Sequence, residues 1–118
     1  MAVKRIVANI ATSRREIDAV TAFYRDIFEL EVAMDHGWIA TLTCQATMIT
    51  QLSIASEGGS ATPVPDLSIE VDNLDEIQAR LHDQGIALEY GPVTEPWCVR
   101  RFYVRDPVGK LLNVLEHV

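Results

Sequence analysis

The sequence predicts an α+β fold built from two consecutive βαβββ units, and three observations support this prediction. A strand pattern, a helix-capping spacing and an amphipathic stripe follow one another twice in the same order along the chain. Residues 55–65 are rich in Ser, Gly, Thr and Pro, which is typical of an exposed connector. Residues 106–109, Asp-Pro-Val-Gly, form a turn signal between two β-rich runs. We expect one domain, 1–118, with units at about 1–57 and 64–118.

Composition and charge restrict the class of protein. A chain of 118 residues with 48% hydrophobic and 23% charged residues is typical of one soluble globular domain. The formal charge of −7 repels phosphate backbones and anionic lipids, so we expect neither nucleic acid nor membrane as a partner. Cys44 and Cys98 are too few for a disulfide scaffold, and the N-terminal apolar run is too short for a signal peptide. We therefore expect a cytoplasmic protein.

The first unit begins with a predicted strand and a helix. Val3–Ala11 alternates, and Asn9 is the polar side chain in its middle. Ser13 and Glu16 have the spacing of a capping box, which predicts that a helix starts here. Apolar residues then recur at helical intervals at Ile17, Val20, Tyr24 and Ile27.

Three further strands are predicted in the first unit. Leu30–Ala33 begins an extended segment, and residues 35–37, Asp-His-Gly, suit a tight turn before Trp38–Leu42. The fourth strand covers Met48–Ile54, where Gln51 lies in the middle of one face.

The second unit repeats the order strand then helix. Asp66–Val71 alternates, and Asn73 with Glu76 repeats the capping spacing. The amphipathic stripe of the helix comprises Leu74, Ile77 and Leu81. Gly85 is well placed to end this helix in a left-handed conformation, with Ile86 closing the contact.

The second unit ends in three predicted strands. Ile86–Tyr90 is a short strand and Gly91–Pro96 a loop. Val99–Arg105 and Lys110–Leu115 are the arms of a hairpin around the turn at 106–109.

The second face of this hairpin carries unusual side chains for a sheet that faces water. Arg101 and Tyr103 alternate with Phe102 and Val104, and Asn113 lies between two leucines on the other arm. This face is expected to line a cavity. If the two half-sheets curve together, their free faces enclose a cleft whose polar residues are Asn9, Gln51 or Ser53, Asp66, Ser68, Glu70, Arg101, Tyr103 and Asn113.

Four motifs give the chain a resemblance to a known family. They are AFYRD at 22–26, VDNLDE at 71–76, GPVTEPW at 91–97 and RFYVRDPVGKLLNV at 101–114. In this order they make the chain resemble the vicinal oxygen chelate superfamily, the group of glyoxalases, bleomycin resistance proteins and extradiol dioxygenases. The resemblance covers essentially the whole chain and implies curved sheets around a cleft. It also implies a homodimer.

The same resemblance bears on metal binding. Metal-dependent members hold a divalent ion with His and Glu or Gln side chains at four positions, which correspond here to Asn9, Gln51 (or Ser53), Asp66 and Asn113. Amide oxygens are weak ligands for transition metals, and one carboxylate without imidazole leaves such an ion poorly neutralised. We therefore expect no catalytic metal and no cofactor. Magnesium held by several waters with help from a substrate stays an open alternative.

The resemblance favours a metal-independent protein that binds or sequesters a small molecule, of the bleomycin-resistance-like, antibiotic-resistance-like type. Asp66 and Glu70 would pair with a cationic group, although Arg101 in the same cavity would make an anionic or zwitterionic ligand equally reasonable. Trp38 and Trp97 either line the pocket or pack the core or dimer. The full set of expected ligand-binding residues is Asn9, Trp38, Gln51, Asp66, Glu70, Trp97, Arg101, Tyr103 and Asn113.

Two alternatives remain. The first is an enzyme, a metal-dependent lyase, isomerase or dioxygenase with non-standard ligands, in which Asp66 or Glu70 acts as ligand or general base. The second is a structural or regulatory dimer, which predicts a cleft filled by the protein's own side chains.

Overall fold

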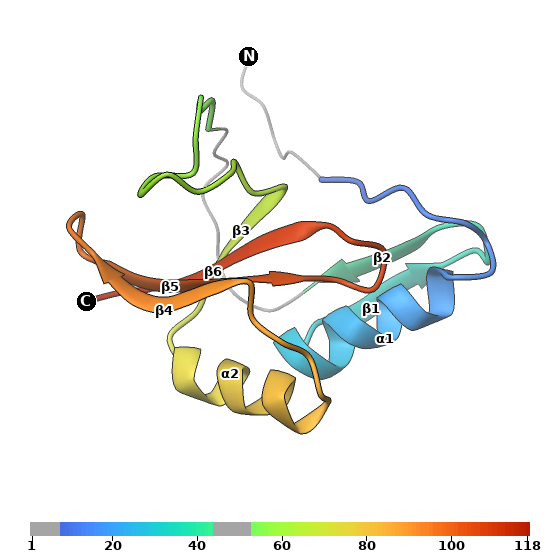
Figure 1. The fold of residues 1–118 in the computed structure, drawn as a ribbon. Coiled ribbons are helices and arrows are strands. Elements are labelled where there is room, and N and C mark those ends of the chain that lie inside the picture. The colour runs from blue at the N-terminus through green and yellow to red at the C-terminus, as the bar shows by residue number, and fades with distance from the viewer. Residues whose placement is uncertain (1–7, 44–52) are drawn as a thin grey trace, which may run out of the picture.

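The computed structural model of the protein describes residues 8–43 and 53–118 (Figure 1). The described elements are α1 (Ile17–Phe28), β1 (Glu31–Asp35), β2 (Ala40–Thr43), β3 (Leu67–Glu70), α2 (Leu74–Asp83), β4 (Tyr90–Glu95), β5 (Val99–Arg105) and β6 (Leu111–His117). β1 and β2 form an antiparallel pair, and the other strands form a sheet in the order β3-β6-β5-β4. This confirms the α+β class and the βαβββ order of the second unit. The predicted strand at 48–54 lies almost wholly outside the described residues.

The predicted hairpin is confirmed as the centre of the larger sheet. β5 and β6 pair antiparallel, with Tyr103 opposite Asn113, whereas β3 joins the other edge of β6 in parallel. The turn is held by Asp106, whose Oδ1 accepts hydrogen bonds from the backbone N–H groups of Val108 at 3.0 Å and Lys110 at 2.8 Å. Gly109 supplies the positive φ, +84°, that this turn requires.

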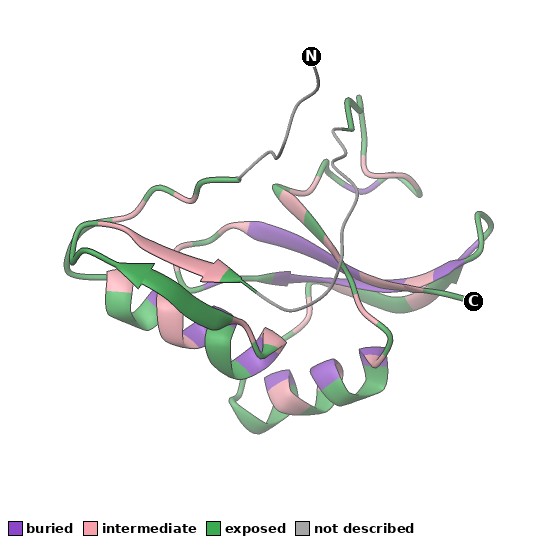
Figure 2. Ribbon diagram, turned by 180° about the vertical axis from the view of Figure 1, so that it is seen from behind, coloured by how far each residue is buried: buried purple, intermediate pink, exposed green. Residues whose placement is uncertain are grey.

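The core lies between one face of this sheet and the two helices. Alternation along β5 and β6 directs Phe102, Val104, Leu112 and Val114 to the same side, and all four are fully buried. Figure 2 shows the buried stripes of α1 and α2 turned toward the sheet. Burying each large apolar side chain stabilises the fold by about 1.5–3 kcal/mol. The helical residues of this core are Val20, Phe23, Tyr24, Ile27, Leu74, Ile77 and Leu81.

The helix ends follow the sequence in part. Gly85 has a φ of +72°, and the N–H of Ile86 reaches the carbonyl of Leu81 at 2.9 Å, so the predicted left-handed stop of α2 is confirmed. The two capping boxes are not formed as expected. Ser13 and Asn73 bond the side chains of Glu16 and Glu76, at 3.1 Å in each case, rather than helix N–H groups.

Two strand predictions differ from the structure. Residues 8–11, the described part of the strand expected over Val3–Ala11, are irregular, whereas residues 3–7 lie outside the described residues. β4 covers Tyr90–Glu95, where a loop was expected, and residues 86–89 precede the strand instead of forming it. The cause is a shift of register between Tyr90 and Val93. This irregularity accommodates Gly91 and Pro92, which otherwise interrupt a strand, because Pro cannot donate to the ladder.

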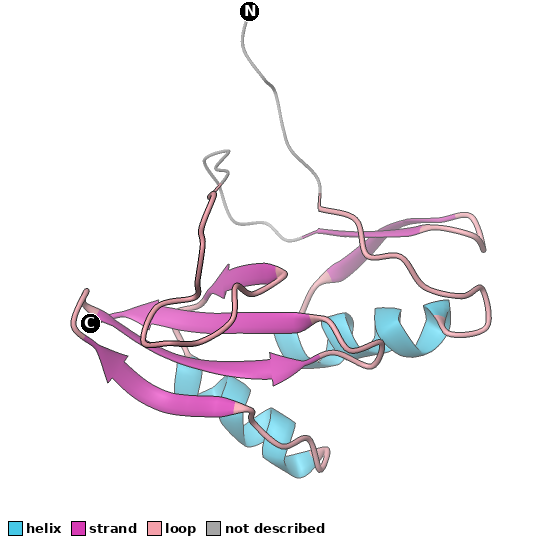
Figure 3. Cartoon of the chain, turned by 45° about the horizontal axis from the view of Figure 1, so that its top comes forward, coloured by secondary structure: helices cyan, strands magenta, loops and turns pink. Residues whose placement is uncertain are grey.

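The connector between the two units is mostly exposed, as its composition predicts, but part of it lies against the sheet. Thr62 is buried, with 9% of its surface exposed. Figure 3 shows the loop that precedes β3 lying over the four-stranded sheet, on the side opposite the helices. The face of the sheet that does not pack on helices is therefore covered in part by the chain itself.

Candidate ligand-binding face

The four-stranded sheet has a polar face opposite its helix-packed face. The register places Tyr103, Asn113 and Ser68 side by side across three strands. One step along, Arg101, Leu115 and Glu70 are likewise neighbours. Side chains of directly paired residues point to the same side of a sheet. We define the polar face by these residues together with two from β4 and the following turn: Ser68, Glu70, Glu95, Trp97, Arg101, Tyr103, Asn113 and Leu115.

A buried ion pair lies at the centre of this face. Arg101 Nη2 is 3.6 Å from Glu95 Oε2, and the two side chains are only 4% and 2% exposed. Glu95 also accepts hydrogen bonds from the hydroxyls of Ser60 and, at 2.7 Å, Tyr90. These contacts, the Ser60 bond first, hold the pKa of the Glu95 carboxyl below its usual value against the opposing effect of burial. Glu95 is therefore a buried carboxylate that stays ionised.

Three aromatic rings surround the guanidinium group of Arg101. Its central carbon lies 5.0 Å from the ring centre of Tyr103, 5.3 Å from that of Trp97 and 5.5 Å from that of Tyr90. A cation within about 6 Å of such a ring is attracted to its negative face. Trp97 closes this group toward solvent, because 48% of its surface is exposed. Arg101 thus occupies an aromatic cage formed by its own chain.

The connector covers the cage from the solvent side. Tyr103 Oη lies 3.0 Å from Thr62 Oγ1 and donates to the carbonyl of Pro63 at 3.1 Å. Arg101 Nη2 donates to the carbonyl of Gly59 at 3.3 Å. A side chain at Gly58 would collide with the Pro63 carbonyl and the Tyr103 hydroxyl, so this close approach requires glycine.

Two buried polar atoms of the face lack a hydrogen-bond partner among the residues that the structure describes. They are Nε of Arg101 and Oδ1 of Asn113. The amide nitrogen of Asn113 donates to Ser68 Oγ at 3.1 Å, so only the oxygen of that side chain is unpaired. Most buried polar atoms in folded proteins are satisfied, and each exception calls for an explanation. A ligand that supplied one acceptor and one donor would satisfy both.

The remaining expected ligand residues lie at the rim of this face or away from it. Asp66 is exposed, and its Oδ2 accepts from the backbone N–H of Leu111 at 2.7 Å. Glu70 is exposed at the rim of the face, where its Oε1 is 2.6 Å from Nδ1 of His117. Asn9 is exposed before α1, and Trp38 is 68% exposed beside the β1–β2 turn. Gln51 lies outside the described residues.

Four residues of this arrangement are not among those that the sequence pattern points to. Glu95 and Tyr90 belong to β4, most of which the sequence predicts to be a loop, and Ser60 and Thr62 belong to the connector. The GPVTEPW motif is the one signal for Glu95, because it marks this stretch as part of the family pattern. For Ser60 and Thr62 the sequence carries no signal.

The described residues at the expected metal positions do not fit a transition-metal site. Asp66 is committed to a backbone N–H group, and the Asn113 amide offers one neutral oxygen. Within residues 8–43 and 53–118, no group of three His, Cys, Asp or Glu side chains could hold a metal ion. Because Gln51 lies outside these ranges, metal independence stays a prediction.

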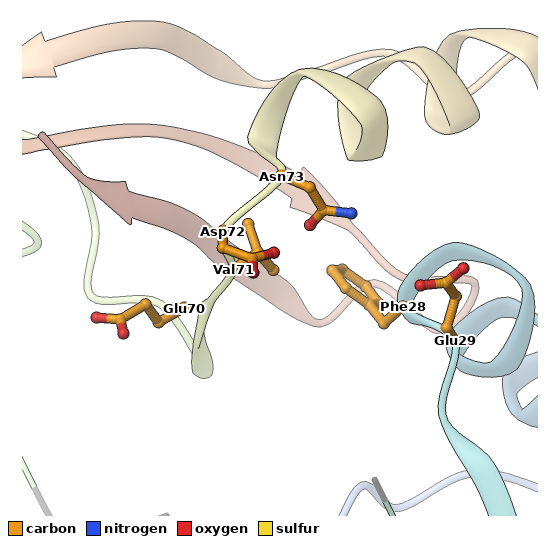
Figure 4. Close-up of a pocket in the computed structure, with 6 residues that line it drawn as sticks. All are labelled: Phe28, Glu29, Glu70, Val71, Asp72 and Asn73. Atoms are coloured by element: carbon orange, nitrogen blue, oxygen red, sulfur yellow. The ribbon is translucent and has the colours of Figure 1, made fainter. Parts of the chain in front are cut away.

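A concavity of about 400 Å³ lies between the end of α1 and the start of α2 (Figure 4). Its acidic residues do not converge. The close-up shows Glu70 pointing away from Phe28, and Glu29 is already paired with Arg80 at 3.0 Å. The lining residues are Phe28, Glu29, Glu70, Val71, Asp72 and Asn73. This hollow offers no polar group that is aimed at a shared point.

Comparison with known proteins places the fold. A sequence model of the Glyoxalase/Bleomycin resistance protein/Dioxygenase superfamily matches residues 6–114, and no curated protein matches the chain. Lactoylglutathione lyase from Agrobacterium tumefaciens has a TM-score of 0.61 at 24% identity, over 86% of this chain and 85% of that one. TnmS3, an antibiotic binding protein from Streptomyces sp. CB03234, has a TM-score of 0.65 at 18% identity, over 100% and 97%. At these identities the likeness shows the fold.

Proposed function

Because the chain belongs to the Glyoxalase/Bleomycin resistance protein/Dioxygenase superfamily, as its four motifs predict, we propose that it binds a small organic molecule on the polar face without a catalytic metal. Binding or sequestration of this kind requires no bond to be made or broken. The antibiotic binding protein among the structural neighbours supports the proposal by analogy of fold.

One observation carries the proposal: a charged pair is buried within an aromatic cage on the sheet face away from the helices. Replacing a buried ion pair by apolar residues of similar volume is often neutral or stabilising. A face that served packing alone would therefore be expected to be apolar. The unpaired Nε of Arg101 and Oδ1 of Asn113 also support the proposal, because each leaves a hydrogen bond available to a ligand.

Four residues of the face have a proposed role in binding. The half-exposed ring of Trp97 stacks on a flat part of the ligand, and Tyr103 contributes its ring to the aromatic cage. Asn113 accepts one hydrogen bond. Glu70, beside His117, forms the rim. Asn9, Gln51 and Asp66 stay proposed ligand-binding residues on the sequence pattern alone.

We further propose a homodimer in the cytoplasm. β1 is exposed along its length, and apolar residues of the first unit face solvent at Val32 (41% exposed), Met34 (39%) and Trp38 (68%). Exposed apolar groups on a short two-stranded sheet are what a second copy of the chain would cover. If the cleft is shared, Trp38 reaches the ligand from the partner. No helix among the described residues is long and apolar enough to cross a membrane.

The test is ligand binding by calorimetry, with aromatic antibiotics as the panel. Trp97→Ala and Asn113→Ala should each weaken binding about fivefold or more, since stacking and a buried hydrogen bond are each worth about 1 kcal/mol or more. Ile54→Ala, at a residue 93% exposed, is the control and should leave affinity unchanged. Binding that survives both substitutions would place the ligand elsewhere. Loss with Trp38→Ala as well would indicate a cleft shared between two copies.

The alternative function is a metal-dependent lyase, isomerase or dioxygenase. The lactoylglutathione lyase neighbour favours it. It requires metal ligands other than those the described residues offer, and metal analysis of the purified protein separates it from simple binding.

A further inference from the structure

We propose that the connector segment 58–63, here called the strap, is a built-in occupant of the ligand site. It lies on the cage through polar groups of the kind that a ligand would offer. Ser60 donates its hydroxyl to Glu95, and the Gly59 carbonyl accepts from Arg101 at 3.3 Å. The Tyr103 hydroxyl forms hydrogen bonds with the Thr62 hydroxyl and the Pro63 carbonyl. This inference rests on the proposed function and identifies what the ligand must displace.

Two features weaken the attachment of the strap to the sheet. Its sequence, Gly-Gly-Ser-Ala-Thr-Pro, contains no large apolar side chain that could anchor it in a core. Three consecutive residues adopt the left-handed region, with φ of +83° at Gly59, +52° at Ser60 and +59° at Ala61. For Ser and Ala this conformation is unfavourable, because Cβ approaches the backbone. Undocking releases that cost, so the hydrogen bonds and the backbone contact with Trp97 are what oppose displacement.

The groups left behind define the chemical class of the ligand. Arg101 and Glu95 neutralise each other, so the cage itself presents no net charge to an incoming molecule, and the rim carboxylate of Glu70 lies beside the imidazole of His117. A cation would be placed against the guanidinium that already fills the cage, and an anion would be placed against the Glu95 carboxylate. The favoured ligand is uncharged. It carries a hydroxyl or amide donor for Glu95 and a carbonyl or hydroxyl acceptor for Arg101 and Tyr103.

Trp97 adds a planar requirement. A side-chain carbon built at Gly59 would lie 2.8 Å from the indole ring of Trp97, so the strap backbone passes directly against this ring. Once the strap leaves, the same ring surface becomes available for stacking. The ligand is therefore an uncharged, hydroxylated or amide-bearing molecule with a flat ring next to its polar groups.

Gly58→Ala is the variant that separates the strap from the rest of the site. The added methyl group collides with the Pro63 carbonyl and the Tyr103 hydroxyl, so it undocks the strap while leaving the cage intact. Ile54→Ala is the control, since residue 54 lies just before the strap and is 93% exposed. If the strap is docked nine-tenths of the time, freeing it should tighten ligand binding about tenfold.

The experiment combines calorimetry with amide hydrogen exchange on the whole protein. The probes are three aromatic compounds of similar size: phenyl glucoside (uncharged), benzylamine (cationic) and benzoate (anionic). We expect phenyl glucoside to bind best, to bind more tightly to Gly58→Ala than to Ile54→Ala, and to speed exchange at the Gly58 and Thr62 amides. Those amides now donate within the strap, to the Thr62 carbonyl at 2.8 Å and the Gly59 carbonyl at 3.0 Å.

The outcomes are distinguishable. A probe that binds the polar face while protecting the strap amides further would show that the strap closes over the ligand, which overturns the inference and leaves the proposed function standing. Tighter binding of either charged probe would overturn the ligand class. If no probe or antibiotic binds either the native protein or Gly58→Ala, although exchange shows a freed strap in the variant, both the inference and the proposed function fail.

Discussion

Replacing Arg101 by Met tests whether the ion pair at the centre of the polar face is truly buried. The substitution removes the cation but keeps a long side chain among the three rings. Glu95, with a side chain only 2% exposed, then lacks its charged partner and keeps the hydrogen bonds from Ser60 and Tyr90. Breaking one side of a buried pair costs about 3–5 kcal/mol. Because the two hydroxyls remain, we expect a loss at the lower end of this range, about 3 kcal/mol.

Urea unfolding followed by circular dichroism measures this loss, and for a domain of this size it corresponds to a fall in Tm on the order of 10 °C. The double variant Arg101→Met with Glu95→Gln should recover most of the lost stability, since no buried charge remains. Arg105→Met on the same strand is the control. Its pair with Glu89, at 2.8 Å, is 45% exposed on both sides, so water screens it and its loss should cost far less stability than the loss of Arg101. Equal effects at the two arginines would refute the argument.

The remaining predictions concern pH, metal and assembly. The folded-state pKa of Glu95 lies below its usual 4.5, so the unfolded chain binds the proton more readily; stability should fall as pH drops below about 4.5, and less steeply in Glu95→Gln. Protein dialysed against zinc, nickel, manganese and iron should retain well under one equivalent of metal per chain. Light scattering at micromolar concentration should give the mass of a dimer, because β1 and its apolar neighbours need a cover.

Each of these has a contradicting result. Parallel acid-unfolding curves for the native protein and Glu95→Gln would show that Glu95 is not the titrating group. Near-stoichiometric metal that disappears on Asp66→Ala would favour the enzyme. A monomeric mass would remove the support for a cleft shared between two copies.

Local chemistry explains which parts of the fold the sequence could predict. The hairpin turn is specified by four consecutive residues, 106–109. The side chain of Asp106 and the backbone of Gly109 form it without help from distant residues. Gly85 and Ile86 specify the end of α2 in the same local way. β4 was not predicted because Gly91 and Pro92 are typical of a loop. This segment becomes a strand only through its pairing with β5, which includes a shift of register.

In the candidate site, too, local sequence predicts some features and distant contacts decide the others. Alternation along β5 is enough to place Arg101 and Tyr103 on one face. Alternation could not identify the partners of this face. The hydrogen bonds of Ser60 with Glu95 and of Thr62 with Tyr103 join residues that are 35 and 41 positions apart in the sequence. Nor could alternation reveal that Asp66 holds a backbone N–H group and that Glu70 contacts His117. Periodicity predicts the side to which a residue points, whereas tertiary packing decides what it meets there.

The strand order β3-β6-β5-β4 has a consequence for synthesis on the ribosome. β3 is made first among these strands, yet its partner in this sheet is β6, the last to be made. Until residues 111–117 leave the exit tunnel, β3 and the apolar stripe of α2 have no completed sheet to join. We therefore expect the second unit to fold late in synthesis and in one cooperative step, which is completed when β6 inserts between β3 and β5.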